Sequence, residues 1–177
     1  MTDYETYEHY VKSLIVKYAS KGIIIDTNIL LAYLVGTYDL DFMCVWKRTK
    51  MYDCDDYEFI KKVLLQFSRR IVTAHILAEL SNHSKGIKGQ RSRGYFEVFR
   101  EHFRNVDEKH IPKERILDCP SLPEFGVTDL GIVEAVKEFG YLPFIDEFAL
   151  ADYFRRELCV EVLNLNDLRT VKMGRIV

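Results

Sequence analysis

Short apolar runs alternate with longer amphipathic segments along most of the chain. We predict strands at Ile23–Ile25, 70–74, 141–145 and 160–165, and a shorter one at Ile116 and Leu117. Apolar residues at helical spacing predict helices over residues 4–18, 28–35, 55–67, 75–84, 95–103, 129–139 and 147–158. Such alternation is typical of a parallel sheet with helices on both faces. The pattern therefore predicts an α/β fold.

Some parts of the pattern are less regular. Residues 36–53 give no clear period, and the Gly-rich loop 86–94 is expected to be the most mobile stretch. Thr128 is predicted to be the N-cap of a helix that Gly140 ends. No linker, repeat or low-complexity segment interrupts the 177 residues, so a single domain, 1–177, is expected.

Composition narrows the classes of protein. With 48% hydrophobic and 29% charged residues the chain resembles an ordinary globular protein. No segment approaches the roughly 20 apolar residues of a membrane helix, and the polar N-terminus does not resemble a secretory signal. The cysteines are scattered, so we expect reduced thiols in a cytoplasmic protein rather than a zinc or disulfide framework; they are Cys44, Cys54, Cys119 and Cys159.

Basic residues are concentrated in one segment, although the net charge is −2. Between residues 85 and 104 there are six Lys or Arg and two Glu, which gives about +4 here and about −6 elsewhere. Two interpretations remain open. The segment is either a solvated loop and helix face, or a phosphate-binding patch beside an acidic pocket.

Acidic residues follow the predicted strands. Asp26 comes directly after Ile23–Ile25, and Asp146 and Glu147 come directly after residues 141–145. Glu79 lies in the helix after the second strand, and Asp129 lies in the first turn of its helix. Because parallel sheets form their sites at the carboxyl ends of the strands, we expect these acids to converge.

Gathered carboxylates repel one another unless protons or a cation neutralise them. Oxygen ligands without histidine or thiolate select Mg²⁺ or Mn²⁺. Such a site suits phosphodiester hydrolysis, in which the metal lowers the pKa of a bound water. Taken singly, Asp26 is compatible with a helix cap, and Asp129, Asp146 and Glu147 are compatible with charged first turns. Glu79 is compatible with a helix surface, although its apolar neighbours disfavour this. The metal hypothesis therefore rests on the joint placement of the acids.

Three stretches resemble the PIN-domain ribonucleases, a family that includes the VapC-like bacterial proteins. "IIIDTNILLAYL" is similar to their first strand and helix, and "TAHILAEL" to their second acidic motif. "TDLGIVEAVKEFGYLPFIDEFALADYFRRELCVEVLNLNDL" is similar to the segments of their third and fourth acids. The resemblance implies a three-layer α/β/α, Rossmann-like domain. It also implies an endoribonuclease that cuts single-stranded RNA with Mg²⁺ or Mn²⁺.

The resemblance also implies roles for individual residues. The catalytic and metal-binding acids would be Asp26, Glu79, Asp129 and Asp146, with Glu147 as the other candidate for the fourth acid. Asn28 and Thr73 would support them by hydrogen bonding, and Thr27 is a further supporting residue. We expect Arg91, Arg93 and Arg100 to hold the RNA backbone. Tyr95 is a candidate for base stacking, whereas Phe96 is expected in the core.

The chain departs from the family at two points. The family often has Thr-x-Asp or Thr-Asp-Asp at the fourth acid, whereas this chain has Ile145-Asp146-Glu147. The chain is also longer than the compact toxins of the family. It adds an N-terminal helix (about residues 3–20) and a helical, basic-loop insertion (about residues 84–106). Many bacterial members of the family are toxins of toxin–antitoxin pairs, and dimers are common among them. The resemblance therefore leaves two roles open: a toxin with an antitoxin partner and a homodimer, or another RNA-processing role.

Other classes compete with the nuclease. An aspartyl phosphatase commonly uses Asp-x-Asp, but Asn28 stands at the second position. A nucleotide-binding module is disfavoured because neither G-x-G-x-x-G nor a P-loop occurs. A PIN-like module that binds RNA or protein without catalysis is the remaining alternative.

Overall fold

Within residues 3–174, which the computed structural model describes, the central sheet has five parallel strands in the order β3-β2-β1-β4-β5. They are β1 (Ile23–Ile25), β2 (Arg70–Thr73), β3 (Asp107–Lys109), β4 (Leu142–Ile145) and β5 (Leu163–Asn164). Ile24 of β1 lies opposite Ile71 of β2 and Pro143 of β4, so β1 is central. The predicted α/β fold with a parallel sheet is confirmed.

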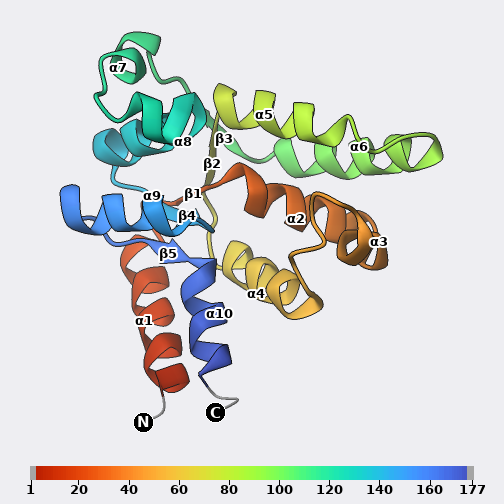
Figure 1. The fold of residues 1–177 in the computed structure, drawn as a ribbon, viewed down its shortest axis with the longest axis horizontal. Helices are drawn as coiled ribbons and strands as arrows, with labels where there is room; N and C mark the ends of the chain where they lie inside the picture. The colour runs from red at the N-terminus through yellow and green to blue at the C-terminus, as the bar shows by residue number, and fades with distance from the viewer. Residues whose placement is uncertain (1–2, 175–177) are drawn as a thin grey trace.

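Helices pack on both sides of this sheet. They are α1 (Asp3–Tyr18), α2 (Thr27–Tyr38), α3 (Leu40–Val45), α4 (Cys54–Leu65), α5 (Ala74–Ser84), α6 (Gln90–Phe103), α7 (Lys113–Leu117), α8 (Leu122–Phe139), α9 (Phe148–Asp152), the π-helix η1 (Tyr153–Glu157) and α10 (Leu165–Met173). Figure 1 shows α8 and α9 on one face of the sheet and α2, α4 and α5 on the other. The arrangement is the expected three-layer α/β/α sandwich.

The middle of the core is formed by β1 and α2. All three isoleucines of β1 are at most 1% exposed, because both faces of the strand are covered by helices. Helix α2 continues to Tyr38 and is longer than the predicted 28–35. A Cβ at Gly36 would lie 2.5 Å from the ring of Tyr57 on α4. Glycine at this position therefore allows α4 to pack closely and does not end the helix.

Residues 36–53 are more regular than their pattern predicts, because they contain the end of α2 and the whole of α3. The Asp39 carboxylate accepts a hydrogen bond from the N–H of Phe42 (2.9 Å) and caps α3. Asp53 and Asp56 form a capping box that begins α4. These caps are local, but a six-residue helix is too short to give a clear apolar period.

Helices α5 and α6 form a hairpin that projects away from the sheet (Figure 1). The predicted loop 86–94 is wrong for its second half, because α6 begins at Gln90. Gly89, with φ +66°, makes the turn into the helix, and a Cβ at Gly94 would lie 2.6 Å from the ring of Tyr38. This close packing against Tyr38 of α2 leaves no room for a side chain at Gly94, which lies within α6. The mobility of residues 86–89 stays a prediction.

Two features after the hairpin differ from prediction. Ile116 and Leu117 belong to α7 and not to a strand, while the edge strand β3 is polar and gave no apolar signal. Helix α8 begins before the predicted residue 129 and is broken at Gly126 (φ +74°), so Thr128 lies inside it and is not its N-cap. The predicted end at Gly140 is confirmed by its left-handed conformation.

The C-terminal elements are shorter than predicted. The helix expected over 147–158 is divided between α9 and η1, and the strand expected over 160–165 shrinks to the two residues of β5. Asn164 then caps α10 by accepting a hydrogen bond from the N–H of Asn166 (3.0 Å). Of the helices that the structure describes, none is both long and apolar enough to cross a membrane.

Candidate functional site

The predicted acids come from four segments that meet at the carboxyl edge of the sheet. Asp26 follows β1 and Asp146 follows the adjacent β4, and the N–H of Asp26 donates to the carbonyl of Phe144 (2.9 Å). Glu79 is on α5, Asp129 follows the break in α8, and Glu147 is the N-cap of α9. We call this set the acidic edge: Asp26, Glu79, Asp129, Asp146 and Glu147.

Asp26 is the most deeply buried member, with 6% of its surface exposed. Burial raises its pKa well above the ordinary value of 3.8, and a carboxyl–carboxyl hydrogen bond with Asp146 and the charges of Asp146 and Asp129 act in the same direction. The nearby N–H of Asn28 acts in the opposite direction, although no side-chain capping bond forms at the start of α2. Burial and the neighbouring acids therefore favour the protonated form of the Asp26 carboxyl.

Asp129 connects the two halves of the acidic edge. Burial raises its pKa to about 7, and the charges of Glu147, Glu79 and Asp146 add to this effect. Together with the contacts of Asp26, these interactions include all five predicted acids. The five acids therefore influence one another electrostatically, whereas their convergence on one shared ion stays a prediction.

Tyr52 is a residue of this site that the sequence did not reveal. Its side chain is 2% exposed, and its hydroxyl donates a hydrogen bond to the Asp146 carboxylate. The Arg169 guanidinium lies 5.0 Å from the centre of the Tyr52 ring and is anchored by Asp56 at 2.7 Å. Burial, followed by the charge of Asp146, raises the pKa of Tyr52, so the phenol stays a donor. No motif marked Tyr52, because it lies in the segment of irregular pattern.

Glu79 has its own set of partners. Thr27 donates its hydroxyl hydrogen to Oε2 of Glu79 (3.0 Å), and Nε2 of His83 lies 3.7 Å from Oε1. Nδ1 of His83 contacts the guanidinium of Arg48 (3.1 Å). Burial, followed by the charge of Arg48, lowers the pKa of His83. The supporting role of Thr27 thus has a direct contact, whereas His83 and Arg48 carried no signal in the sequence.

Asn28 and Thr73 do not make the side-chain contacts that we expected. Thr73 is buried, and its hydroxyl accepts a hydrogen bond from the N–H of Ile76 (3.3 Å) as the N-cap of α5. The side chain of Asn28 is exposed, and only its backbone affects Asp26. Thr73 therefore supports the site by fixing the start of the helix that carries Glu79.

The predicted basic residues lie on α6 (Figure 1). Arg91 stacks its guanidinium over the ring of Phe42 at 4.6 Å, and Phe42 in turn stacks on Trp46. Arg93 and Arg100 are exposed. Tyr95 is fully buried, and its hydroxyl is hydrogen-bonded to the hydroxyl of Ser84 (2.7 Å), which excludes the base-stacking role considered for it. Phe96, as expected, packs against the core.

The donor set has the chemistry of a hard-cation site, because it consists of carboxylate oxygens whose mutual repulsion a dication would relieve. The present side-chain positions do not yet enclose an ion. Among residues 3–174, no three or more Asp, Glu, His or Cys side chains are close enough together to hold one metal. Binding at the acidic edge would require Asp26 and Asp129 to turn toward a shared ion.

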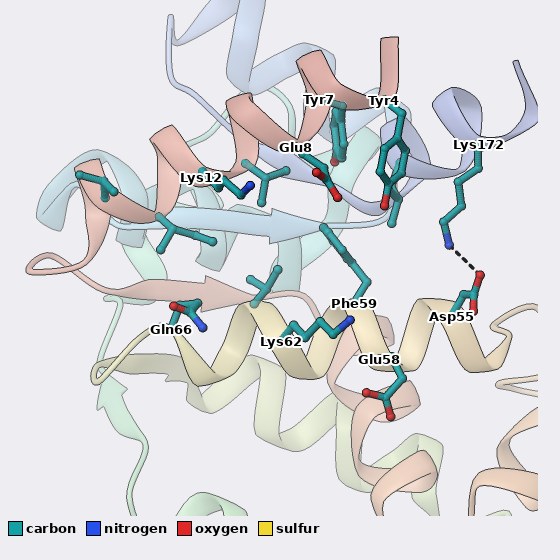
Figure 2. A pocket seen from close by; sticks show the side chains of 15 residues that line it. Tyr4, Tyr7, Glu8, Lys12, Asp55, Glu58, Phe59, Lys62, Gln66 and Lys172 are labelled. Atoms are coloured by element: carbon teal, nitrogen blue, oxygen red, sulfur yellow. Dashed lines mark hydrogen bonds and ion pairs between the residues drawn. The ribbon is translucent and has the colours of Figure 1, made fainter. Parts of the chain in front are cut away.

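A separate groove of about 690 Å³ lies between α1, α4 and α10. Figure 2 shows Tyr7, Glu8 and Lys12 of α1 facing Phe59 and Lys62 of α4 across it. None of the five residues of the acidic edge lines this groove. Its mixed rim, with Lys172 paired to Asp55 (3.2 Å), does not favour one class of ligand.

No protein-family model matches the chain, and no curated protein matches it significantly.

Proposed function

We propose that the protein is a PIN-like endoribonuclease that hydrolyses phosphodiester bonds of single-stranded RNA with Mg²⁺ or Mn²⁺. The observation that carries the proposal is the electrostatic coupling of five acids from four separate segments. Repulsion between buried acids destabilises the folded state. Carboxyl groups with such shifted pKa values are typical of functional sites. The motif resemblance and the position at the carboxyl edge of a parallel sheet support the same chemistry.

In this proposal Asp26 and Asp129 hold the principal ion, and Glu79 and Asp146 or Glu147 complete its shell directly or through water. When bound, the dication would lower the pKa of a water molecule and offset negative charge on the phosphate. The water oxygen bonds to phosphorus, and the bond from phosphorus to the 3′ oxygen breaks. The products carry a 5′-phosphate and a 3′-hydroxyl.

The protein's own groups prepare this reaction. Tyr52 orients Asp146 by donating a hydrogen bond, and Thr27 orients Glu79. Asp26, whose protonated form is favoured by burial, would release that proton and act as a carboxylate ligand when a dication is bound. Arg91, Arg93 and Arg100 are exposed on α6 and would contact the RNA phosphates, and Arg48 is a further exposed cation beside His83.

A second function is a PIN-like module that binds RNA or protein without catalysis. The observation that favours it is the absence, among the described residues, of acids positioned to enclose one ion. In that case Asp26 stays a buried carboxyl whose pKa is raised, and Tyr52 keeps its hydrogen bond to Asp146. RNA retention without cleavage under any metal condition would select this function.

A labelled single-stranded RNA tests the two functions. We expect wild-type protein to cleave it with Mn²⁺ and to stop when EDTA is added. Asp26→Asn should lower the rate by about 100-fold or more, because it removes a central ligand. Asp118→Asn, which changes an exposed acid at the end of α7, is the matched control and should cleave normally. Cleavage by Asp26→Asn at the wild-type rate would refute the assignment.

Two biological roles in the cytoplasm stay open within this proposal: the toxin of a toxin–antitoxin pair, with an antitoxin protein and a second copy of the chain as partners, or another RNA-processing role. The toxin role predicts a growth phenotype. Expression in a bacterial host should then arrest growth. Asp129→Asn should relieve the arrest without lowering the amount of protein. Equal arrest by both proteins would separate the toxicity from the acidic edge.

A further inference from the structure

Two cysteine thiols lie in contact outside the acidic edge. The Sγ atoms of Cys44 and Cys54 are 4.0 Å apart, although the residues are ten positions apart in the chain. Cys44 is on α3 and Cys54 is the first residue of α4. Cys44 is half-buried and Cys54 is exposed, so a small reagent can reach the pair. Rotation of the side chains would have to close the sulfur separation to about 2 Å to form a bond.

The segment between these thiols, residues 45–53, makes a hydrogen bond to the acidic edge. Its Tyr52 donates a hydrogen bond to Asp146, and the carbonyl of Met51 accepts one from Arg169 (3.1 Å). Its Thr49 donates to the carbonyl of Met43 (2.8 Å). A covalent bond between its two ends would therefore restrain the loop that positions Tyr52.

We propose that Cys44 and Cys54 are a reversible disulfide pair, oxidised by exchange with a low-molecular-weight disulfide such as glutathione disulfide. The proposal does not depend on the nuclease function. It changes the earlier expectation for these two thiols only, because they are neighbours in the fold and not in the sequence.

The exchange is balanced in two steps. The Cys54 thiolate attacks one sulfur of glutathione disulfide, whose S–S bond breaks and releases one glutathione thiolate. The Cys44 thiolate then attacks the Cys54 sulfur and expels the second glutathione. The protein loses two electrons and two protons, and the glutathione disulfide gains them as two thiols. Partial burial, followed by Cys54 itself, raises the pKa of Cys44, which agrees with Cys54 reacting first.

Limited proteolysis gives a direct test. Lys47, Arg48 and Lys50 are exposed between the two cysteines, so trypsin can cut the segment that the disulfide would span. The full chain is treated with glutathione disulfide, its free thiols are blocked, and it is then digested with trypsin. The peptide that carries Cys44 and the peptide that carries Cys54 should stay joined in a non-reducing gel. They should separate once a reductant is added. Cys54→Ser should give separate peptides with and without reductant, whereas Cys159→Ser should behave as wild type.

Intrinsic fluorescence gives a second measurement, because Trp46 is the only tryptophan in the chain and lies two residues from Cys44. We expect oxidation to quench its emission and a reductant to restore it. Neither change should occur in Cys54→Ser. The proposal is overturned if excess glutathione disulfide leaves Cys44 open to alkylation, or if each cysteine carries its own glutathione.

Discussion

The acidic edge and the segment 36–53 meet at Tyr52, but they differ in how they are specified. The acids stand directly after strands or within helices whose apolar pattern is clear, so strand direction and the packing of these helices place them at the same edge. The segment 36–53 takes its shape from distant partners, such as Arg169 on the Met51 carbonyl and Tyr57 against Gly36. The comparison shows that the charges of the site are set by topology, whereas their orientation is set by tertiary packing.

The pH dependence of stability gives the largest expected effect. The pKa of Asp129 is raised from 3.8 to about 7, so the folded state binds more protons than the unfolded state between these values. The contribution of Asp129 to the free energy of unfolding of metal-free protein should therefore fall as pH rises through this window and level off above it. His102, whose pKa burial lowers to about 4, acts in the opposite direction, so the Asp129 contribution has to be isolated with a variant. For this half-buried carboxyl we expect a loss of about 2 kcal/mol.

Urea unfolding with EDTA across that pH range measures the effect. The difference in stability between Asp129→Asn and wild type isolates the contribution of Asp129. It should shift in favour of the variant as pH rises through the window, because the amide cannot ionise. Added Mn²⁺ should stabilise wild type above the window and have little effect on the variant. A stability difference between wild type and Asp129→Asn that does not change with pH would contradict the raised pKa of Asp129.

Tyr52→Phe tests the contribution of the packed segment. Loss of the hydroxyl on Asp146 should lower stability by about 1 kcal/mol and RNA cleavage by about 10-fold. Tyr10→Phe is the matched control, because it removes a phenol that donates to the Val162 carbonyl (3.2 Å) away from the acids. Both variants should lose stability, but only Tyr52→Phe should lose activity. Equal activity of the two would assign Tyr52 a purely structural role.

Arg91→Ala gives the smallest expected effect. Its guanidinium is engaged with Phe42, so its removal should weaken RNA binding by about two- to five-fold. Arg93→Ala, at an exposed residue of the same helix, compares a free cation with a stacked one. Binding of a fluorescent single-stranded RNA at two salt concentrations measures both. No change in either variant would exclude the start of α6 from the RNA path.

The parallel sheet and its site edge could be predicted because β1, β2 and β4 are short, buried and strongly apolar. Asp26, Asp146 and Glu147 follow directly from the ends of those strands. The polar strand β3 and the short helix α3 could not be predicted, because neither has an apolar period. Tyr52 and Arg169 could not be found for a different reason: each acts through a partner about one hundred residues away.

The central claim is that Asp26 and Asp129 share one hard dication. Anomalous diffraction from crystals soaked in Mn²⁺ tests it most directly. We expect a peak about 2 Å from a carboxylate oxygen of each residue, with both side chains turned toward it. Soaked crystals in which Asp26 stays bonded to Asp146 and no peak forms between Asp26 and Asp129 would contradict the claim.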